Sequence, residues 1–336
     1  MAITFGSNTT TNGTPGNDTM IGVDPTGNKN DIVYGHQGDD SISAVAGFTS
    51  STIYGGQGND IITDENFTTS GAIGGNVMYG NFGDDTISIG DTAIGDTVYG
   101  GQGNDVIRAT DTAFNVVYGN LGDDSIVSDD SFSNTLYGGQ GNDAVNVFAD
   151  NHDVIYGNFG NDFLYASAFT DNSHMYGGQG DDTLVFTGFF GGGNVNDVET
   201  GNLGNDLFVA TGNNSFGFLE NANDIVTVTD FLQGTDLLSE SDDAIGGFVG
   251  GLQKIAAPGA NAQQALNDAN LAYALNSTER YVFVYGGTGA GYLFLNQTEF
   301  GGQTVQSISG LKIDGSNGEF SVNASDITTF SKTISA

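Results

Sequence analysis

The sequence contains no cysteine and no tryptophan, and it has only three prolines among 336 residues. Without cysteine there is no disulfide, no thiolate metal site and no cysteine nucleophile. The scarcity of proline excludes collagen and proline-rich linkers. No hydrophobic run approaches the ~20 residues needed to cross a bilayer, so no transmembrane segment is expected. The first residues lack basic side chains and an apolar stretch, so a conventional N-terminal signal peptide is not expected either.

Positive charge is also scarce. Six Lys and Arg residues stand against 41 Asp and Glu residues, which gives a formal net charge of −35. A polyphosphate would be repelled by such a chain, so nucleic-acid binding is excluded, as is a basic membrane-surface protein. Residues 1–209 hold 28 acidic and two basic side chains, whereas residues 210–336 hold 13 and four. This difference predicts a boundary near residue 210.

The abundant residues argue against disorder. High charge with many polar residues usually indicates a disordered chain, but this sequence also has 23 Phe, 13 Tyr and a hydrophobic fraction of 38%. Such a chain can form a packed core. Because self-repulsion at this net charge destabilises a compact state, we expect cations to be part of the structure.

Internal repeats organise residues 13–209. The motif Tyr-Gly-Gly-Gln-Gly-Asn-Asp occurs at 54–60, 99–105 and 137–143, and a variant that ends in Asp-Asp occurs at 176–182. Forms with Gly-Asn-Phe or Gly-Asn-Leu alternate with it, and successive copies begin 19–25 residues apart. The further copies start at Tyr34, Tyr79, Tyr118, Tyr156 and Thr200.

Each motif extends to nine residues whose eighth position is always apolar. A position that never holds a polar residue indicates the buried residue of a short strand. The glycines supply turns with positive φ, and Asn is the next most tolerant residue there. The eighth positions are Ile42, Ile62, Ile87, Ile107, Ile126, Val145, Leu164, Leu184 and Phe208.

Weaker copies of the same unit lie between the motifs. Asp31, Asp96 and Asp153 each stand three residues before a motif tyrosine, and Asn76, Asn115 and Asn134 replace that Asp in other copies. One period therefore holds two strands and two turns. This arrangement predicts one coil of a parallel solenoid, with a regular turn at one edge and a longer, irregular turn at the other.

The nine in-phase motifs resemble the RTX (repeats-in-toxin) hemolysin-type calcium-binding nonapeptide over residues 13–209. The resemblance implies an all-β fold, a parallel β-roll solenoid whose turns bind several Ca²⁺, roughly one per coil. It also implies that the sixth-position carboxylates are metal ligands. These are Asp18, Asp40, Asp60, Asp85, Asp105, Asp124, Asp143, Asp162, Asp182 and Asp206.

The sequence departs from the family pattern in the spacing of its good copies. Tandem family repeats recur every nine residues, whereas the good copy here recurs mostly every 19–20. The dense calcium row is therefore expected along one edge, with Asp31, Asp96 and Asp153 as candidate ligands at the other. The alternative is that the aspartates form Asx turns without metal. Stacked, unneutralised carboxylates about 4.8 Å apart would repel each other, which argues against it.

Residues 210–336 are predicted to form a small C-terminal α+β or β module that follows an N-terminal segment (1–12) and the roll (13–209). A helix is expected over 262–275, and strands over 281–285 and 292–295 are expected to form a hairpin. Within it, residues 263–327 resemble the C-terminal module of RTX proteins exported by type I secretion. The resemblance implies the type I secretion machinery as a partner, with an uncleaved C-terminal signal. Alternatively, or in addition, the module caps the solenoid.

Motifs of catalysis are absent from the sequence. It contains neither a Gly-x-Ser-x-Gly nucleophile elbow nor a His-Glu-x-x-His zinc motif. The three histidines, His36, His152 and His174, lie inside repeat units and are expected to be exposed repeat variants. We therefore expect no enzyme activity.

These observations favour a secreted calcium-binding structural protein that assembles with itself or adheres at the surface of a Gram-negative-type bacterium. An S-layer subunit, a matrix filament or an adhesive coat would fit this description. The alternative is an extracellular binding module for cell-surface polysaccharide or for a partner protein. An ice-binding solenoid is disfavoured because the residues that flank the apolar position form no regular threonine row.

Overall fold

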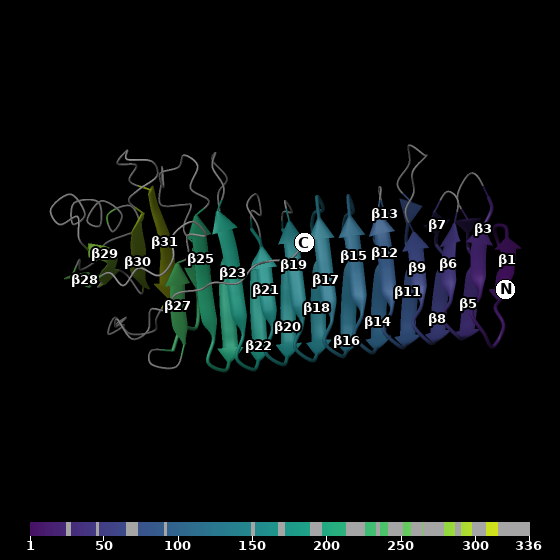
Figure 1. Cartoon of the computed structure of the whole chain (residues 1–336). Helices are drawn as coiled ribbons and strands as arrows, with labels where there is room; N and C mark the ends of the chain where they lie inside the picture. The colour runs from purple at the N-terminus through teal and green to yellow at the C-terminus, as the bar shows by residue number, and fades with distance from the viewer. Residues whose placement is uncertain are drawn as a thin grey trace. The chain divides into compact units, whose positions relative to one another are not determined.

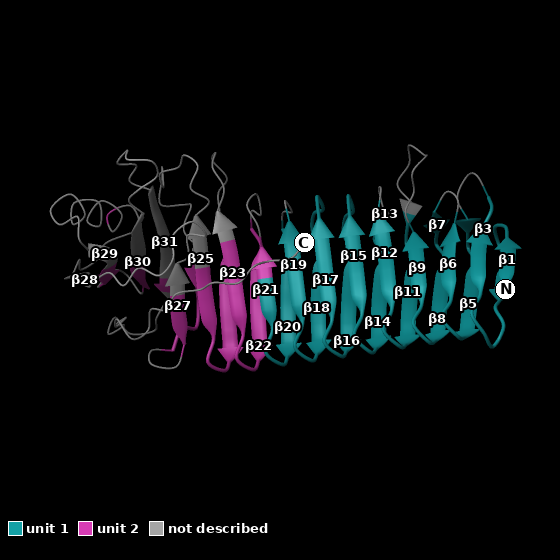
Figure 2. Cartoon of the chain, viewed as in Figure 1, with its two compact units in different colours: residues 1–164 teal, residues 165–336 magenta. Residues whose placement is uncertain are grey.

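The computed structural model (Figure 1) describes most of the repeat region and several strands beyond it. The described residues are 1–24, 28–44, 47–64, 73–90, 93–148, 152–166, 172–188, 197–212, 226–232, 236–240, 251–256, 264, 279–285, 290–297 and 307–314. The chain divides into two compact units, Met1–Leu164 and Tyr165–Ala336 (Figure 2). This division falls inside the repeats, so the module boundary expected near residue 210 stays a prediction.

Unit 1 is a stack of coils that form two parallel sheets. The first, which we call the tyrosine sheet, consists of β2 (Thr10–Asn12), β5 (Ile32–Gln37), β8 (Thr52–Gln57), β11 (Val77–Phe82), β14 (Thr97–Gln102), β16 (Val116–Leu121), β18 (Thr135–Gln140) and β20 (Val154–Phe159). The second, the opposite sheet, consists of β1 (Ala2–Phe5), β3 (Thr19–Gly22), β6 (Ser41–Ala44), β9 (Ile61–Asp64), β12 (Thr86–Gly90), β15 (Val106–Thr110), β17 (Ser125–Asp129) and β19 (Ala144–Phe148). The chain alternates between the two sheets, and residues 1–12 contribute the first strand of each.

The repeat sets the register of both sheets. Tyr99 pairs with Tyr79 on one side and Tyr118 on the other, and Ile107 pairs with Ile87 and Ile126 in the same way. Side chains alternate in and out along each strand, so Val98 is buried while Thr97 and Tyr99 reach the surface. The eighth positions of all nine motifs have no exposed surface. The predicted parallel roll and its buried apolar position are therefore confirmed.

The longer turns at the second edge add short pairings of their own. β4 (Asn28–Lys29) pairs with β7 (Phe48–Thr49), and β10 (Ile73–Gly74) pairs with β13 (Ala93–Ile94). Single bridges then link Ile94 to Ala113 and Ala113 to Phe132. The irregular edge is thus tied from coil to coil even though its turns differ in length.

Unit 2 continues both kinds of strand. Its parallel strands are β22 (His174–Gln179), β24 (Val198–Leu203) and β26 (Val226–Val228) in one sheet and β23 (Thr183–Gly188), β25 (Leu207–Gly212) and β27 (Leu237–Glu240) in the other; β21 (Phe163–Ala166) spans the division between units. The pairing of β26 with β24 and of β27 with β25 extends the coil pattern beyond residue 209.

Strands of the C-terminal region are added to the sheet that contains β26. β31 (Ser307–Asp314) pairs with β26 in parallel, and β30 (Ala290–Gln297) and β29 (Glu279–Tyr285) follow in antiparallel order, with β28 (Gly251–Ala256) beside β29. The predicted hairpin is confirmed by the pairing of β29 with β30. The helix expected over 262–275 lies outside the described residues, except for Gln264, whose backbone is helical. The described part of the chain has no helix long and apolar enough to span a membrane.

Candidate metal-binding edge

The regular turn connects each strand of the tyrosine sheet to the next strand of the opposite sheet, and glycines make it tight. In the motif at 54–60 Gly56 has φ 126° and Gly58 has φ 122°, a region that a residue with a Cβ rarely occupies. The alternate motifs carry Asn at the first of these positions, where Asn81 and Asn120 both have φ 81°. The turn therefore keeps one shape in both forms of the motif, and the turns stack in register.

The sixth-position aspartates form a continuous ladder inside this edge. The backbone N–H of each aspartate donates to Oδ1 of the aspartate in the following coil, at 2.7–2.8 Å from Asp18 through Asp162 in unit 1. Each of these side chains is at most 3% exposed. In unit 2 the N–H of Asp182 donates to Asp206, and the N–H of Asp206 donates to Asp236. The structure thus brings the ten predicted sixth-position carboxylates into buried ladders within the two units.

The second carboxylate oxygen faces a glycine. In six sixth-position aspartates of unit 1, Oδ2 is buried and accepts no hydrogen bond: Asp40, Asp60, Asp85, Asp105, Asp124 and Asp143. Between the coils of Asp85 and Asp124 it lies where a Cβ on the motif's first glycine would be, beside the carbonyl oxygen of the equivalent glycine in the next coil. For Asp124 the two glycines are Gly119 and Gly138. A carboxylate oxygen and a carbonyl oxygen from adjacent coils therefore meet at each step.

Burial makes these carboxylates costly to ionise. Loss of water, with added repulsion from the neighbouring rungs, raises the pKa of Asp60, Asp85 and Asp105 to about 7 from the ordinary 3.8. The pKa values of Asp124 and Asp143 are raised to about 7 for the same reason. A row of buried acids in this state either binds protons or requires a cation.

This donor set fits Ca²⁺. Calcium takes six to eight oxygen ligands from carboxylates, carbonyls and water, and each step of the ladder supplies one oxygen of each protein type. The described residues contain no cluster of three or more Asp, Glu or His side chains that could hold an ion by themselves. A site at this edge would therefore rest on one buried aspartate per coil, completed by turn carbonyls and water.

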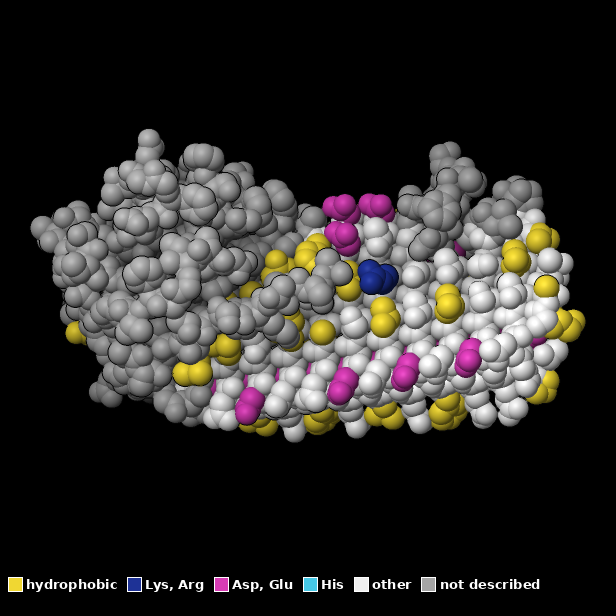
Figure 3. All heavy atoms as spheres, in the orientation of Figure 1, with side chains coloured by type: hydrophobic (Ala, Val, Ile, Leu, Met, Phe, Trp, Pro, Cys, Tyr) yellow, Lys and Arg dark blue, Asp and Glu magenta, His cyan; other side chains and the backbone are white. Residues whose placement is uncertain are grey.

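A second, exposed row runs beside the buried ladder. From Asn17 to Asn142 the fifth motif positions alternate between Asn and Asp. The N–H of each donates to the side-chain oxygen of the preceding one, as Asp84 does to Asn59 at 3.0 Å and Asn104 to Asp84 at 2.7 Å. Figure 3 shows separated acidic side chains in a row along the lower edge of the face in view. Because neutral Asn residues separate the charged ones, repulsion along this row is smaller than along the buried ladder.

The irregular edge has a ladder of the same kind with mostly neutral rungs. The N–H of Asn76 donates to Asp96 Oδ1 at 2.8 Å, and the N–H of Asp96 donates to Asn115 Oδ1 at 2.7 Å. The candidate ligands Asp31, Asp96 and Asp153 are all buried here. Burial raises the pKa of Asp96 to about 6. Since Asn supports the same hydrogen bonds, this ladder does not depend on charge, and the role of the three aspartates as ligands stays a prediction.

Several members of the two ladders were not singled out from the sequence. Ser51 and Ser173 are rungs of the irregular edge; they stand three residues before a motif tyrosine, as Asp31 does, so the signal was present. Asp236 extends the ladder of unit 2 beyond the last motif, and no repeat spacing marked it. Asp18 differs from its equivalents because the ammonium group of Met1 lies 2.7 Å from its Oδ1 and lowers its pKa to about 2.

Two further buried acids lie outside the ladders. Asp64 accepts hydrogen bonds from the backbone N–H of Phe48 and the side-chain amide of Asn76, and burial raises its pKa to about 7. Glu199 is fully buried with no hydrogen bond to either carboxylate oxygen, and burial raises its pKa well above its ordinary range. Glu199 occupies a position that is Val, Ile, Leu or Met in the other coils.

Comparison with known families agrees with this geometry. The family described as the RTX calcium-binding nonapeptide repeat matches the chain at residues 12–50, 45–63, 70–88, 93–126, 118–147, 149–172 and 170–188. No curated protein is similar enough in sequence to count as a relative. The matched segments contain the buried aspartates from Asp18 to Asp162 in unit 1 and Asp182 in unit 2.

Proposed function

Because this chain belongs to the family of RTX calcium-binding repeat proteins, we propose that it is an extracellular structural protein whose roll folds on Ca²⁺ and then assembles or adheres at a cell surface. The repeats of this family bind Ca²⁺, and its members are typically secreted by Gram-negative bacteria. The proposal includes export by type I secretion and no enzyme activity. The bound ion supplies positive charge and replaces the protons that the buried carboxylates would otherwise need.

The buried aspartate ladder is the observation that supports calcium-dependent folding. Without metal, consecutive carboxylates in a low-dielectric interior repel each other, and the Oδ2 atoms from Asp40 through Asp143 have no donor. Ions bound to the folded roll and not to the unfolded chain contribute their binding free energy to folding. The aspartates of the buried ladder would hold the ions, and the motif glycines would allow the close approach of carbonyl oxygens.

Circular dichroism with and without calcium tests this part. We expect a β spectrum in millimolar Ca²⁺ and loss of that spectrum in EDTA at pH 8. Magnesium at the same concentration is the control, because it screens charge equally but demands a stricter geometry. A full β spectrum in EDTA at pH 8 would be incompatible with calcium-coupled folding.

An apolar row on the irregular edge supports assembly or adhesion. Ile94, Phe114 and Phe132 lie on three successive coils, and their side chains are 40%, 56% and 47% exposed. The rings of Phe114 and Phe132 meet edge to face, with their centroids 5.1 Å apart. A continuous row of exposed apolar side chains is typical of an interaction surface.

Sedimentation velocity tests assembly directly. We expect larger species as calcium rises from micromolar to millimolar, and we expect F114S/F132S to remain smaller at equal calcium. A folded protein that stays monomeric throughout would exclude assembly. It would then favour the second candidate, a binding module for polysaccharide, which has structural support in the tyrosine sheet.

A further inference from the structure

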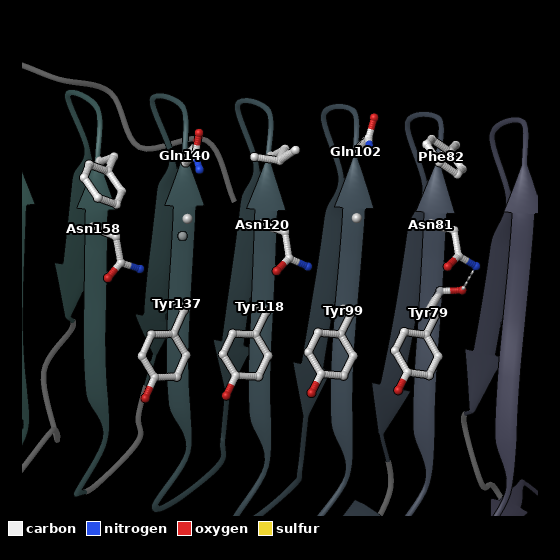
Figure 4. A pocket seen from close by; sticks show the side chains of 15 residues that line it. Tyr79, Asn81, Phe82, Tyr99, Gln102, Tyr118, Asn120, Tyr137, Gln140 and Asn158 are labelled. Carbon is white, nitrogen blue, oxygen red and sulfur yellow. Dashed lines mark hydrogen bonds between the residues drawn. The ribbon is translucent and has the colours of Figure 1, made fainter.

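The tyrosine sheet of unit 1 carries a shallow groove that runs across the strands. One hollow of about 670 Å³ spans five strands from Tyr79 to Phe159. A second hollow begins at Tyr34 and shares Asn81 and Phe82 with the first, so the groove continues toward β5. Figure 4 shows three parallel rows of side chains in it, which come from the third, fifth and sixth positions of β11 and the strands after it.

The first row consists of tyrosines at a constant spacing. From Tyr34 to Tyr156, neighbouring ring centroids are 4.8–4.9 Å apart and their planes are within 7° of parallel. Figure 4 shows the rings side by side with one face of each turned outward. The row therefore offers a repeated aromatic surface with a hydroxyl at each step.

The second and third rows repeat every two coils. Coils with Asn in the second row carry Phe or Leu in the third, as in Asn120 with Leu121; the coils between them carry Gly and Gln, as in Gly101 with Gln102. Phe82 and Phe159 are each 50% exposed. Amide groups that both donate and accept hydrogen bonds thus alternate with apolar contacts along the groove.

The groove is uncharged although the chain has a net charge of −35. No Asp, Glu, Lys or Arg lines either hollow. Such a surface offers no charged side chain with which an ionic ligand could pair. The fitting ligand is a neutral, extended polymer with apolar ring faces and hydroxyl edges.

We propose that this groove binds a neutral β-1,4-linked polysaccharide along the axis of the roll. In such a glycan each pyranose ring advances the chain by close to one strand spacing, and alternate rings are turned over, so that the chain repeats every two sugars. The tyrosines match the single step, and the Asn/Gln alternation matches the double step. The inference rests on the proposed calcium-dependent folding, because the rows are in register only in the folded roll.

Calorimetry with cellohexaose tests the proposal on the full chain in millimolar Ca²⁺. Tyrosine fluorescence provides a second readout, since the chain has no tryptophan and seven of its 13 tyrosines form the row. We expect saturable binding of cellohexaose. We expect at least tenfold weaker binding of maltohexaose, whose α-linked chain curves away from a straight groove, and of polygalacturonate, which is anionic.

The repeats themselves supply matched variants. Thr200 occupies the tyrosine position in unit 2, where it pairs with Tyr176, so Y99T/Y118T should fold. Asn120→Gly reproduces the second-row residue of the neighbouring coils. On the opposite sheet, Arg108→Ser reproduces its neighbour Ser88 and is the control. We expect at least a tenfold loss of affinity for Y99T/Y118T, a smaller loss for Asn120→Gly and none for Arg108→Ser.

Circular dichroism on every sample separates this inference from the proposed folding. A native β spectrum with no cellohexaose binding overturns the groove proposal and leaves calcium-dependent folding intact. Equal binding by Y99T/Y118T places the ligand elsewhere and also overturns it. So does a wild-type dimer that Y99T/Y118T abolishes, because the face is then an interface between copies. A β spectrum in EDTA contradicts the folding proposal alone.

Discussion

The backbone N–H of Asp105 donates to Oδ1 of Asp124 at 2.8 Å, from one coil of the roll to the next. At the other edge the N–H of Asp96 makes the equivalent bond to Oδ1 of Asn115 at 2.7 Å. The two bonds have the same geometry, but the acceptor is a carboxylate in the first and a neutral amide in the second. An aspartate in the first ladder therefore does two things that can be separated: it accepts a hydrogen bond and it supplies a negative charge for a cation.

Asp124→Asn and Asp124→Ala separate these two roles. The Asn variant keeps an acceptor for the Asp105 N–H and adds a donor near the carbonyl of Gly138, so we expect it to be more stable than wild type in EDTA at pH 8 but to gain less stability from calcium. The Ala variant leaves a buried N–H without a partner, which costs about 1–3 kcal/mol. The β signal that remains in EDTA at pH 8 measures the first effect, and thermal melts in calcium measure the second. Identical responses to calcium in Asp124→Asn and wild type would contradict the role of Asp124 as a ligand.

Gly119→Ala is expected to destabilise the roll because its Cβ would collide with Oδ2 of Asp124 and the carbonyl oxygen of Gly138. Overpacking of this kind costs about 1–3 kcal/mol, and here it also closes the place where the two oxygens meet. Gly16→Ala is the matched control, since a Cβ there meets nothing within 4 Å. Melting and calcium titration of both variants check the prediction, which fails if the two variants behave alike.

The repeat explains why so much of the fold could be predicted. A periodic sequence stacks equivalent residues, so the apolar eighth position indicated the core, and Ile87, Ile107 and Ile126 indeed lie in one buried row. The same logic placed the aspartates in one line. Their role as calcium ligands follows from the family and the chemistry of the edge.

The groove and the burial of Asp64 and Glu199 could not be predicted, because they depend on three-dimensional geometry that the repeat pattern does not contain. The alternation of Gln with Phe or Leu can be read from the sequence. Only the structure shows that these residues and the tyrosines share the outward face of one sheet and line a groove. No sequence pattern marks Asp64 as a buried acid, because its hydrogen-bond partners Phe48 and Asn76 come from other coils. Glu199 stands at a position where strand alternation predicts an apolar residue, and only the structure shows that it is fully buried.

In the absence of calcium, acid is expected to stabilise the fold in part by protonating the buried aspartates. The pKa values of Asp60, Asp85, Asp105, Asp124 and Asp143 rise from 3.8 to about 7 in the folded, metal-free roll, so folding takes up protons. Their protonation supports the fold fully below about pH 4 and is lost as the pH rises through 7. The pKa of Asp18 is lowered to about 2, so this residue has the opposite effect on the pH dependence of stability, but it is one group against five. We expect circular dichroism in EDTA to show more β structure at pH 5 than at pH 8; the reverse order would contradict the raised pKa values.

Glu199→Met is expected to stabilise unit 2. Glu199 pairs with Met175 on one side and Val228 on the other, and its carboxyl is fully buried with a pKa raised by burial and by Asp197. Methionine at this position restores the apolar row and removes a desolvation cost of about 1–3 kcal/mol. Because the raised pKa means that wild-type stability falls as the pH rises, the advantage of the variant should be largest at pH 8 and smaller at pH 5.

Amide hydrogen exchange over Val198–Leu203 in millimolar calcium measures this effect locally, which suits a solenoid whose coils need not open together. We expect slower exchange in Glu199→Met than in wild type at pH 8 after correction for the intrinsic exchange rate. Glu199→Gln should lie between them, because it removes the charge but keeps a buried polar group. Met175→Leu is the control for a change of side-chain shape alone and should leave the exchange rates near those of wild type. Faster exchange in Glu199→Met would show that the buried carboxyl stabilises this strand through an interaction that a thioether cannot replace.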